Sequence, residues 1–261
     1  MSAERRDRGS KISLDSVSKQ FGYGAGQVVH ALDQINLEFP ESQFVCIIGP
    51  SGCGKSTLLN IVAGLMHPTA GRILVSGQEV HGPGRDRGMV FQQDACFLWR
   101  RVRSNIEYGL EIRGIPRSER RAISDKFLNL VGLTEFADAY PKELSGGMKK
   151  RVAIAMVLAN EPEVLLMDEP FGSLDYPTKV GLQKALLQIW MTTKRTTLFV
   201  THDLEEALFL ADRLIVLDGG SVVDDIAVNF SRPRVDELRT SPEFQSMKNS
   251  VWDYISADAE A

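Results

Sequence analysis

The sequence predicts an α/β fold with a mixed, mainly parallel sheet, an N-terminal antiparallel β subdomain and an inserted α-helical subdomain. Residues 12–17 and 35–39 alternate apolar and polar side chains, which is typical of half-buried antiparallel strands. Between about residues 94 and 160 the apolar spacing becomes helical. Further along, continuous apolar runs alternate with helical segments, which is the pattern of a parallel sheet covered by crossover helices.

The composition is that of an ordinary globular protein and limits the functions to consider. A chain of 261 residues with 43% hydrophobic and 25% charged residues can bury a full core. Its net charge of −4 argues against a nucleic-acid scaffold, which would carry a basic excess, so no nucleic-acid partner is expected. Cys46, Cys53 and Cys96 lack metal-ligand spacing and indicate a reducing compartment.

Neither a membrane span nor a signal peptide is predicted. The longest apolar run, residues 152–159, is far shorter than the roughly 20 residues that a spanning helix needs. Residues 1–11 are polar and charged, and no apolar stretch follows them directly. Any association with a membrane is therefore expected to depend on a partner protein.

The order of the predicted elements divides the chain into four parts. Residues 1–10 are expected to form a disordered tail. A core is expected from residues 11–93 and 160–228, and residues 94–159 form the inserted helical subdomain. The last part, residues 229–261, carries an Arg-Pro-Arg run and acidic residues and is expected to be a loosely attached appendage.

Local patterns predict the individual elements. Besides the two alternating segments, strands are expected at residues 44–48, 72–77, 89–91, 164–167, 196–200 and 214–217. Helices are expected at residues 121–131, 145–159, 176–192 and 203–211. Gly132 should end the first of these helices and Ser145 should cap the start of the second.

A glycine-rich stretch between the strand at 44–48 and a helical pattern carries the strongest signal of chemistry. It fits the phosphate-loop pattern G-x-x-x-x-G-K-[ST] and consists of Gly49, Pro50, Ser51, Gly52, Cys53, Gly54, Lys55, Ser56 and Thr57. The glycines let backbone N–H groups converge on an anion at a helix N-terminus. Lys55 supplies a positive charge for terminal phosphates, and Ser56 supplies a hydroxyl for magnesium. Cys53 is interpreted as a small space-filling residue.

Several polar groups follow predicted strands or begin a predicted helix. Asp168 and Glu169 end the strand at 164–167, where ligands bind in open α/β sheets; Asp168 suits magnesium and Glu169 an attacking water. His202 follows the strand at 196–200, and Gln92 follows the strand at 89–91. Ser145, Gly146 and Gly147 open a helix whose exposed N–H groups form a second anion site. Taken singly, a solvated loop, a surface amide and a helix cap remain alternatives.

Together these residues resemble the ATP-binding subunits of ABC transporters over residues 12–220. Six motifs stand in that family's order: the phosphate loop Gly49–Thr57, the Q-loop Val90-Phe91-Gln92, the signature Leu144-Ser145-Gly146-Gly147-Met148, the magnesium strand ending in Asp168-Glu169, the D-loop Ser173-Leu174-Asp175 and the switch histidine in Thr201-His202-Asp203. The resemblance implies an ATP hydrolase with ATP and Mg²⁺ as its cofactors.

The resemblance also implies roles for single residues. Glu169 would be the general base, His202 would sense the γ-phosphate, and Gln92 would link magnesium to a membrane partner. Ser145, Gly146, Gly147 and Met148 would close over the γ-phosphate held by another copy of the subunit, and Asp175 would help the two copies communicate. An aromatic residue would stack on adenine; Phe21 fits that place and Tyr23 is its rival.

The Ser-Gly-Gly-Met signature, the phosphate loop and the C-terminal motifs are similar to the nitrate, sulfonate and taurine importer group. Such a subunit would work at the cytoplasmic face of the cell membrane as a dimer, with permease subunits and an extracytoplasmic solute-binding protein. Lipid or other transport, and a non-transport mechanical ATPase, remain alternatives. Arg100, Arg101 and Arg103 make the turn after Gln92 unusually basic, where the family faces its permease.

Overall fold

The computed structural model describes residues 10–23, 27–93, 95–172 and 174–257. Of the predicted N-terminal tail, residues 1–9 lie outside this description, and Ser10 already belongs to the first strand. The chain divides into two compact units. One comprises residues 1–84 and 194–261, and the other comprises residues 85–193.

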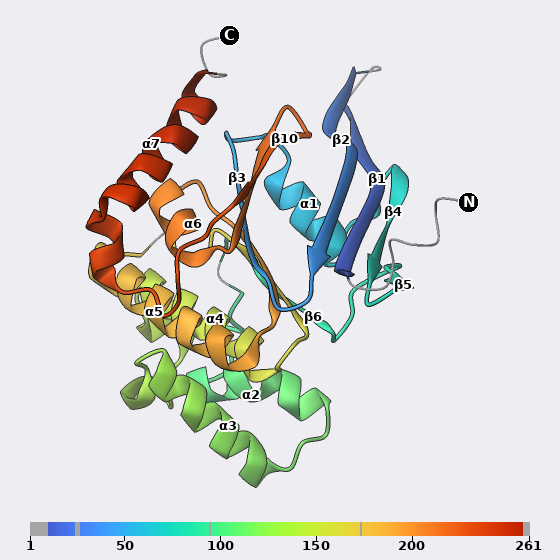
Figure 1. The fold of residues 1–261 in the computed structure, drawn as a ribbon. Helices are drawn as coiled ribbons and strands as arrows, with labels where there is room; N and C mark the ends of the chain where they lie inside the picture. Colours follow the sequence, from blue (N-terminus) through green and yellow to red (C-terminus); the bar gives the residue numbers. More distant parts are fainter. Residues whose placement is uncertain (1–9, 24–26, 94, 173, 258–261) are drawn as a thin grey trace. The chain divides into compact units, whose positions relative to one another are not determined.

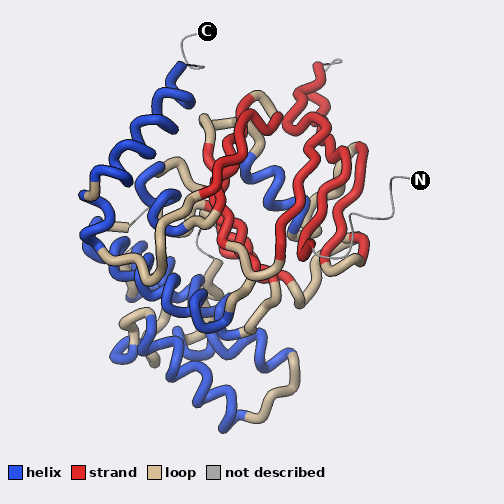
Figure 2. Tube along the Cα trace, in the orientation of Figure 1, coloured by secondary structure: helices blue, strands red, loops and turns tan. Residues whose placement is uncertain are grey.

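The first unit contains an antiparallel sheet with the strand order β2-β1-β4-β5. It is built from β1 (Ser10–Tyr23), β2 (Gln27–Pro40), β4 (Ala70–Val75) and β5 (Gln78–Glu79), and Figures 1 and 2 show the three longer strands lying side by side. This confirms the predicted N-terminal antiparallel sheet, although its first two strands are longer than the alternating segments that signalled them.

A pair of bulges keeps one face of this sheet apolar. Leu14 and Val17 are both buried although they are three positions apart, a spacing that places side chains on opposite faces of a regular strand. The register shifts between these two residues, and Ser16 has a φ of +50°. On the facing strand, Gln34 has a φ of +45° between buried Leu32 and Ile35. The extra residue in each strand returns the next apolar side chain to the core.

The second sheet of this unit is mainly parallel. Its central strand, β3 (Phe44–Ile48), pairs in parallel with both β8 (Thr196–Val200) and β9 (Arg213–Asp218). All five side chains of β3 are buried, as expected for a strand covered on both faces. The helices α1 (Lys55–Val62) and α6 (Leu204–Leu210) pack against these strands. An antiparallel edge strand, β10 (Ser221–Ala227), was not predicted.

The second unit combines two parallel strands with helices. Strand β6 (Arg87–Val90) pairs in parallel with β7 (Val164–Asp168). The helices are α2 (Val102–Ile112), α3 (Arg117–Leu130), α4 (Gly146–Ala159) and α5 (Tyr176–Thr193), with short 3-10 turns at Thr134–Phe136 and Pro141–Glu143. This confirms the α/β class with a helical part.

Both predicted helix ends of this unit are present. Ser145 caps α4 by accepting a hydrogen bond from the backbone N–H of Met148, at 3.3 Å. Gly132 follows α3 with a φ of +65°. Its N–H donates to Asn129 O, and the N–H of Leu133 donates to Leu128 O, the two bonds that close a helix with a left-handed glycine.

The C-terminal segment is packed rather than loosely attached, which corrects the expectation for its described part. It contains a 3-10 helix, η3 (Asp236–Thr240), and α7 (Pro242–Ala257). Phe244 and Val251 are buried, and the ring centroid of Phe244 lies 5.5 Å from that of Phe230. Figure 1 shows α7 running beside α6, and residues of these two helices are in contact. Among the described residues, no helix is long and apolar enough to cross a bilayer.

Candidate functional site

The phosphate-loop pattern lies between β3 and α1, as the sequence predicts. Gly49, Gly52 and Gly54 all have positive φ, at +150°, +83° and +104°. A Cβ on Gly49 would lie 1.9 Å from Leu217 O, and one on Gly54 would lie 2.3 Å from Ala31 O. At Gly49 and Gly54, a residue with a Cβ would therefore clash with a neighbouring carbonyl and would also be strained by the positive φ.

The loop wraps around the ammonium of Lys55. This group is almost buried, and it donates to Gly49 O at 2.8 Å and to Pro50 O at 2.7 Å. Ser56 lies exposed in the first turn of α1, a turn that contains no acidic residue. The result is a positively charged turn at a helix N-terminus, which suits a phosphate chain.

Cys53 is packed inside this loop and is a thiol at neutral pH. Its Sγ lies 3.7 Å from Lys55 Nζ. Burial raises the pKa of the Cys53 thiol, and the nearby Lys55 charge only partly opposes that rise. The side chain is therefore poorly reactive, in keeping with its interpretation as a space-filling residue.

His202 stands at the same sheet edge as the phosphate loop. Strands β3 and β8 are parallel neighbours, so the loop that follows β3 and the turn that follows β8 leave the sheet on one side. The turn itself is fixed: Asp203 N donates to Thr201 Oγ1 at 3.0 Å, and Asp203 caps α6 by accepting from Glu206 N at 3.1 Å. The His202 side chain is exposed.

Phe21 lies on the hairpin that passes the phosphate loop. Its backbone pairs with Val29, two residues before Ala31, whose carbonyl packs against Gly54. The Phe21 ring is half-buried, and Lys19 Nζ lies 5.3 Å from the ring centroid. The side chain of its rival Tyr23 lies outside the described part of the structure.

In the second unit the two parallel strands bring three of the predicted polar residues together. Val90 pairs with Met167, so β6 and β7 end at one edge. Asp168, the buried last residue of β7, precedes Glu169, whose φ is +42°. The amide Nε2 of Gln92 donates to Glu169 Oε2 at 3.3 Å. The left-handed turn at Glu169 stores local strain, which is common at functional positions.

The signature residues form the N-terminus of α4. Ser145 and Gly146 are exposed, while Gly147 and Met148 are half-buried. A Cβ on Gly147 would lie 3.1 Å from the side chain of Leu174, so the two predicted motifs are in close contact.

Asp175 completes the motif beside Leu174. It accepts from Thr178 N at 3.2 Å at the start of α5, and that hydrogen bond lowers the pKa of its carboxyl group. Ser173, the first residue of this predicted motif, lies outside the described residues.

Sequence reasoning missed Lys150, which ties α4 to the Q-loop. The side chain is 1% exposed, and its ammonium donates to Phe91 O at 2.5 Å and to Gln92 O at 2.6 Å. The helix that begins with the signature therefore holds the backbone of Gln92. A signal was available: helical spacing puts Lys150 on the face shared by buried Ala153 and Ile154, where a cation needs partners.

The basic turn after Gln92 is less exposed than the sequence indicates. Arg103 is buried and forms an ion pair with Asp125 at 2.6 Å, so it belongs to the packing of α2 on α3. The Arg100 guanidinium pairs with Glu111 and lies 4.9 Å from the ring centroid of Tyr108. By contrast, Leu98 and Trp99 are exposed, at 61% and 76%.

The fold and these residues define a phosphate-loop ATPase. A family model described as "ABC transporter" matches residues 32–172, more than half of the chain. The chain belongs to the ABC transporter family, as an ATP-binding subunit.

Named relatives match almost the whole chain. The nitrate import ATP-binding protein NrtD of Synechocystis sp. is 46% identical, over 92% of this chain and 93% of that protein. The taurine import ATP-binding protein TauB of Rhizobium johnstonii is 43% identical, over 92% and 94%.

A solved structure supports the enzymatic activity. The ATP-binding cassette MJ0796, in a dimeric post-hydrolysis state bound to ADP and Pi, aligns with a TM-score of 0.77 and 33% identity. The alignment covers 84% of this chain and all of that one. The chain is accordingly an ABC ATPase that binds and hydrolyses ATP.

The contacts of Lys150 generate a prediction. Replacing it with methionine keeps most of the apolar stem but leaves the carbonyls of Phe91 and Gln92 without this donor. We expect Lys150→Met to lower the free energy of unfolding by about 2 kcal/mol and to reduce ATP turnover, because Gln92 loses its anchor. Denaturant titration and steady-state ATPase assays measure both effects. Lys149→Met is the matched control, and equal stability of the two variants would contradict the anchoring role.

Proposed function

We propose that this chain is the ATP-hydrolysing subunit of an importer of the nitrate, sulfonate or taurine type, acting at the cytoplasmic face of the membrane. The observation that carries the proposal is the contact between Gln92 and Glu169, because it joins a candidate catalytic base to the segment that leads toward exposed Trp99. Similarity to nitrate and taurine import proteins over more than nine-tenths of the chain supports the direction of transport.

In the proposed chemistry, the chain's own residues position ATP and an attacking water. Lys55 and the N-terminus of α1 neutralise the phosphate charge. Glu169, held by its strained turn and by Gln92, orients water for in-line attack, and His202 contacts the γ-phosphate from the turn after β8. Phosphoryl transfer needs mainly such positioning and charge stabilisation. Phe21 supplies a half-buried ring for the adenine.

The residues proposed to hold Mg²⁺ are Ser56, Gln92 and Asp168. Their donors are a hydroxyl, an amide oxygen and a carboxylate, which are hard oxygen ligands of the kind that Mg²⁺ takes beside substrate phosphates and water. When bound, the ion would neutralise charge on the β- and γ-phosphates. Asp168 is suited to this because its backbone is fixed as the buried last residue of β7.

A complete site is proposed to need two copies of the chain. The exposed N-terminus of α4, with Ser145, Gly146 and Gly147, is an anion-binding end that its own unit leaves at the surface. In the proposed homodimer it closes over the γ-phosphate bound by the partner, and Asp175 lies next to that contact. MJ0796 is dimeric in two solved structures.

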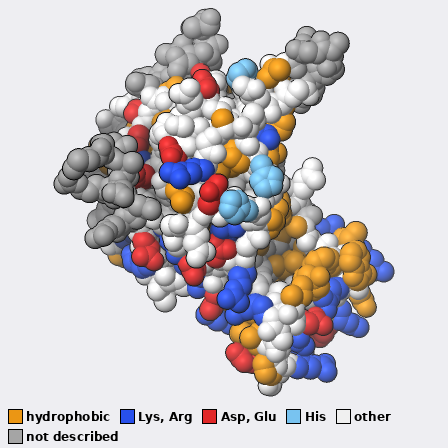
Figure 3. All heavy atoms as spheres, turned by 90° about the vertical axis from the view of Figure 1, so that its right-hand side faces the viewer, with side chains coloured by type: hydrophobic (Ala, Val, Ile, Leu, Met, Phe, Trp, Pro, Cys, Tyr) orange, Lys and Arg blue, Asp and Glu red, His pale blue; other side chains and the backbone are white. Residues whose placement is uncertain are grey.

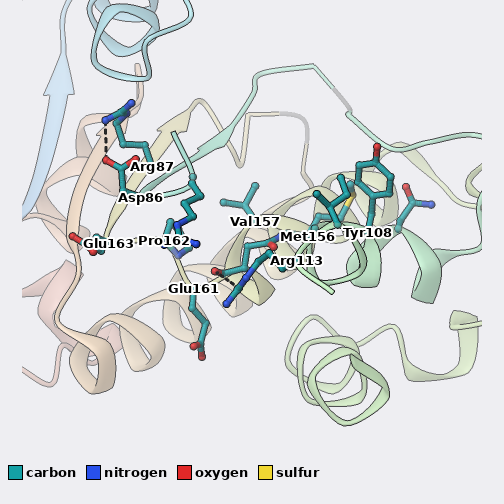
Figure 4. Close-up of a pocket in the computed structure, with 15 residues that line it drawn as sticks. Asp86, Arg87, Tyr108, Arg113, Met156, Val157, Glu161, Pro162 and Glu163 are labelled. Carbon is teal, nitrogen blue, oxygen red and sulfur yellow. Dashed lines mark hydrogen bonds and ion pairs between the residues drawn. The ribbon is translucent and has the colours of Figure 1, made fainter. Parts of the chain in front are cut away.

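The membrane partner is proposed to dock on the second unit. A cavity of about 580 Å³ lies among the start of β6, α2 and the end of α4; Figure 4 shows Tyr108, Arg113 and Met156 among the side chains around it. Tyr108 links the cavity to the turn after Gln92 through its contact with Arg100. Figure 3 shows hydrophobic side chains gathered beside basic ones in the lower right part of the view. Such a surface suits an amphipathic helix of a permease.

The role of Glu169 predicts a separation of binding from turnover. Glu169→Gln keeps the shape of the side chain but removes the base, so ATP affinity should stay within about twofold while turnover falls by roughly 10²-fold or more. Equilibrium nucleotide binding and phosphate release measure the two quantities. Glu135→Gln, an exposed change in the same unit, should behave as wild type. Wild-type turnover in Glu169→Gln would show that Glu169 is not the general base.

The shared site predicts complementation between two inactive variants. Lys55→Ala damages one chain's phosphate loop, and Ser145→Arg blocks the signature end. In a mixed dimer, one of the two sites combines an intact loop with an intact signature. Equal mixing of subunits should therefore restore about a quarter of wild-type turnover, since half the dimers are mixed. Turnover that stays at the level of the separate variants, in mixtures shown to exchange subunits, would contradict a shared site.

The proposed docking surface predicts a selective defect. Trp99→Ala removes a ring that is 76% exposed, so folding and basal ATP hydrolysis should be unchanged. Co-purification with the membrane subunits, and uptake of labelled nitrate or taurine, should be lost because an exposed aromatic residue is a typical interface anchor. Trp252→Ala, which removes a ring that is 59% exposed in α7, is the control. Normal permease binding by Trp99→Ala would overturn this surface.

A further inference from the structure

The short helix that follows His202 depends on the C-terminal segment for its last turn. Helix α6 has seven residues, too few to be stable alone. Ala207 O accepts a hydrogen bond from Ala211 N, but the chain then turns into β9 and Asp212 N donates to Phe44 O instead. The carbonyls of the last three residues, Leu208 to Leu210, must therefore find partners outside the helix.

Two arginines from the C-terminal segment supply those partners. Arg234 Nη1 donates to Leu208 O at 3.1 Å and to Phe209 O at 2.9 Å. Arg232 Nη2 donates to Leu210 O at 2.7 Å, and its guanidinium also pairs with Asp212 at 2.7 Å. Each carbonyl of the last turn that lacks a donor within the helix thus accepts a hydrogen bond from an arginine more than 20 positions further along the chain.

These contacts are buried and charged, so they bind the helix firmly. The Arg234 side chain is fully buried. Desolvation, together with the neighbouring Arg232, lowers the pKa of Arg234 to about 10, so the group keeps its charge at neutral pH. Two positive charges at a helix C-terminus also complement the helix dipole.

The other end of α6 is held by the same C-terminal segment. Glu205, in the first turn, pairs with Arg239 at 3.1 Å and with Lys248 of α7 at 3.0 Å. The Arg239 guanidinium lies 3.8 Å from the ring centroid of Phe209. Residues that follow β10 therefore bind both ends of α6 through hydrogen bonds and ion pairs.

The helix in turn fixes the turn that carries His202. Asp203 is the N-cap of α6, and Glu206, within the helix, accepts a hydrogen bond from Thr201 Oγ1. The residues on both sides of His202 are thus bonded to α6. Any tilt or fraying of this helix displaces the His202 backbone, while the phosphate loop is held separately by β3 and by the packing of Gly49 and Gly54.

We propose that Arg232 and Arg234 are positioning residues for ATP hydrolysis, which cap α6 from the C-terminal segment and thereby hold His202 at the phosphate edge of the sheet. The inference rests on the role proposed for His202. It assigns a part in turnover to residues 229–252, which the motifs of the ATPase do not include.

The test separates positioning from general stability. Arg234→Ala should lower kcat by about tenfold or more and leave KM for ATP within about twofold, because the phosphate loop is untouched. Arg234→Lys, which keeps the charge and can still donate to a carbonyl, should recover part of kcat. Arg72→Ala, which removes an exposed ion pair with Asp15 in the same unit, is the control and should change neither constant.

A direct readout of His202 accompanies the kinetics. The chain has four histidines, so the imidazole resonances of the 15N-labelled full-length protein can be assigned with a His202→Asn variant. Arg234→Ala should shift or broaden the His202 signals and leave those of His30, His67 and His81 in place. If Arg234→Ala does not fold, Arg239→Met, which releases the first turn of α6, is measured in the same way.

Two outcomes would overturn the proposal. The first is a folded Arg234→Ala or Arg239→Met protein with unchanged His202 resonances and wild-type kcat. The second is a loss of kcat that Arg234→Lys does not relieve while the His202 signals stay fixed. His202→Ala is assayed in parallel. If it retains wild-type turnover, the role proposed for His202 fails, whereas the resonance measurement still reports whether Arg234 positions that residue.

Discussion

The parallel pairing of β3 with β8 and β9 is the constraint on which the first unit depends. It buries β3 completely and fixes the direction in which the chain leaves each strand. The phosphate loop and the turn with His202 consequently start from one edge. In the second unit, the pairing of β6 with β7 does the same for Gln92 and Glu169. Residues far apart in the sequence come together because parallel strands end at the same edge of the sheet.

Much of this arrangement can be predicted from the sequence because it depends on local residue patterns. The phosphate loop is predicted from its residue pattern and from its place between a strand and a helix. The structure gives the physical reason for its glycines: they adopt positive φ, and the carbonyls of Leu217 and Ala31 leave no room for a Cβ. Periodicity located most of the strands and helices because one face of each is buried. The helices α2 and α7 were not predicted individually. The half-exposed edge strand β10 gave no such signal, since an edge strand needs no continuous apolar face.

The long-range polar contacts could not be predicted from the sequence. Lys150 and Arg234 look like surface cations in the sequence, yet both are buried. Their partners are backbone carbonyls, which every residue carries and which therefore leave no trace in composition or spacing. The C-terminal segment was predicted to be loosely attached for the same reason, because charged residues usually face solvent. In the structure, Arg232, Arg234 and Arg239 instead bond to groups of the protein itself.

These buried cations share one physical logic. A helix end or a loop exposes carbonyls that β-pairing cannot satisfy, and leaving them unbonded in the interior is costly. A cation on a long stem reaches several carbonyls at once and fixes two segments against each other. Lys150 does this between the signature helix and the Q-loop, and Arg234 between the C-terminal segment and α6. In both cases the fastened segment adjoins a residue proposed to act on ATP. Both contacts restrain segments on which the proposed phosphate chemistry depends, and both cations lie outside the motifs.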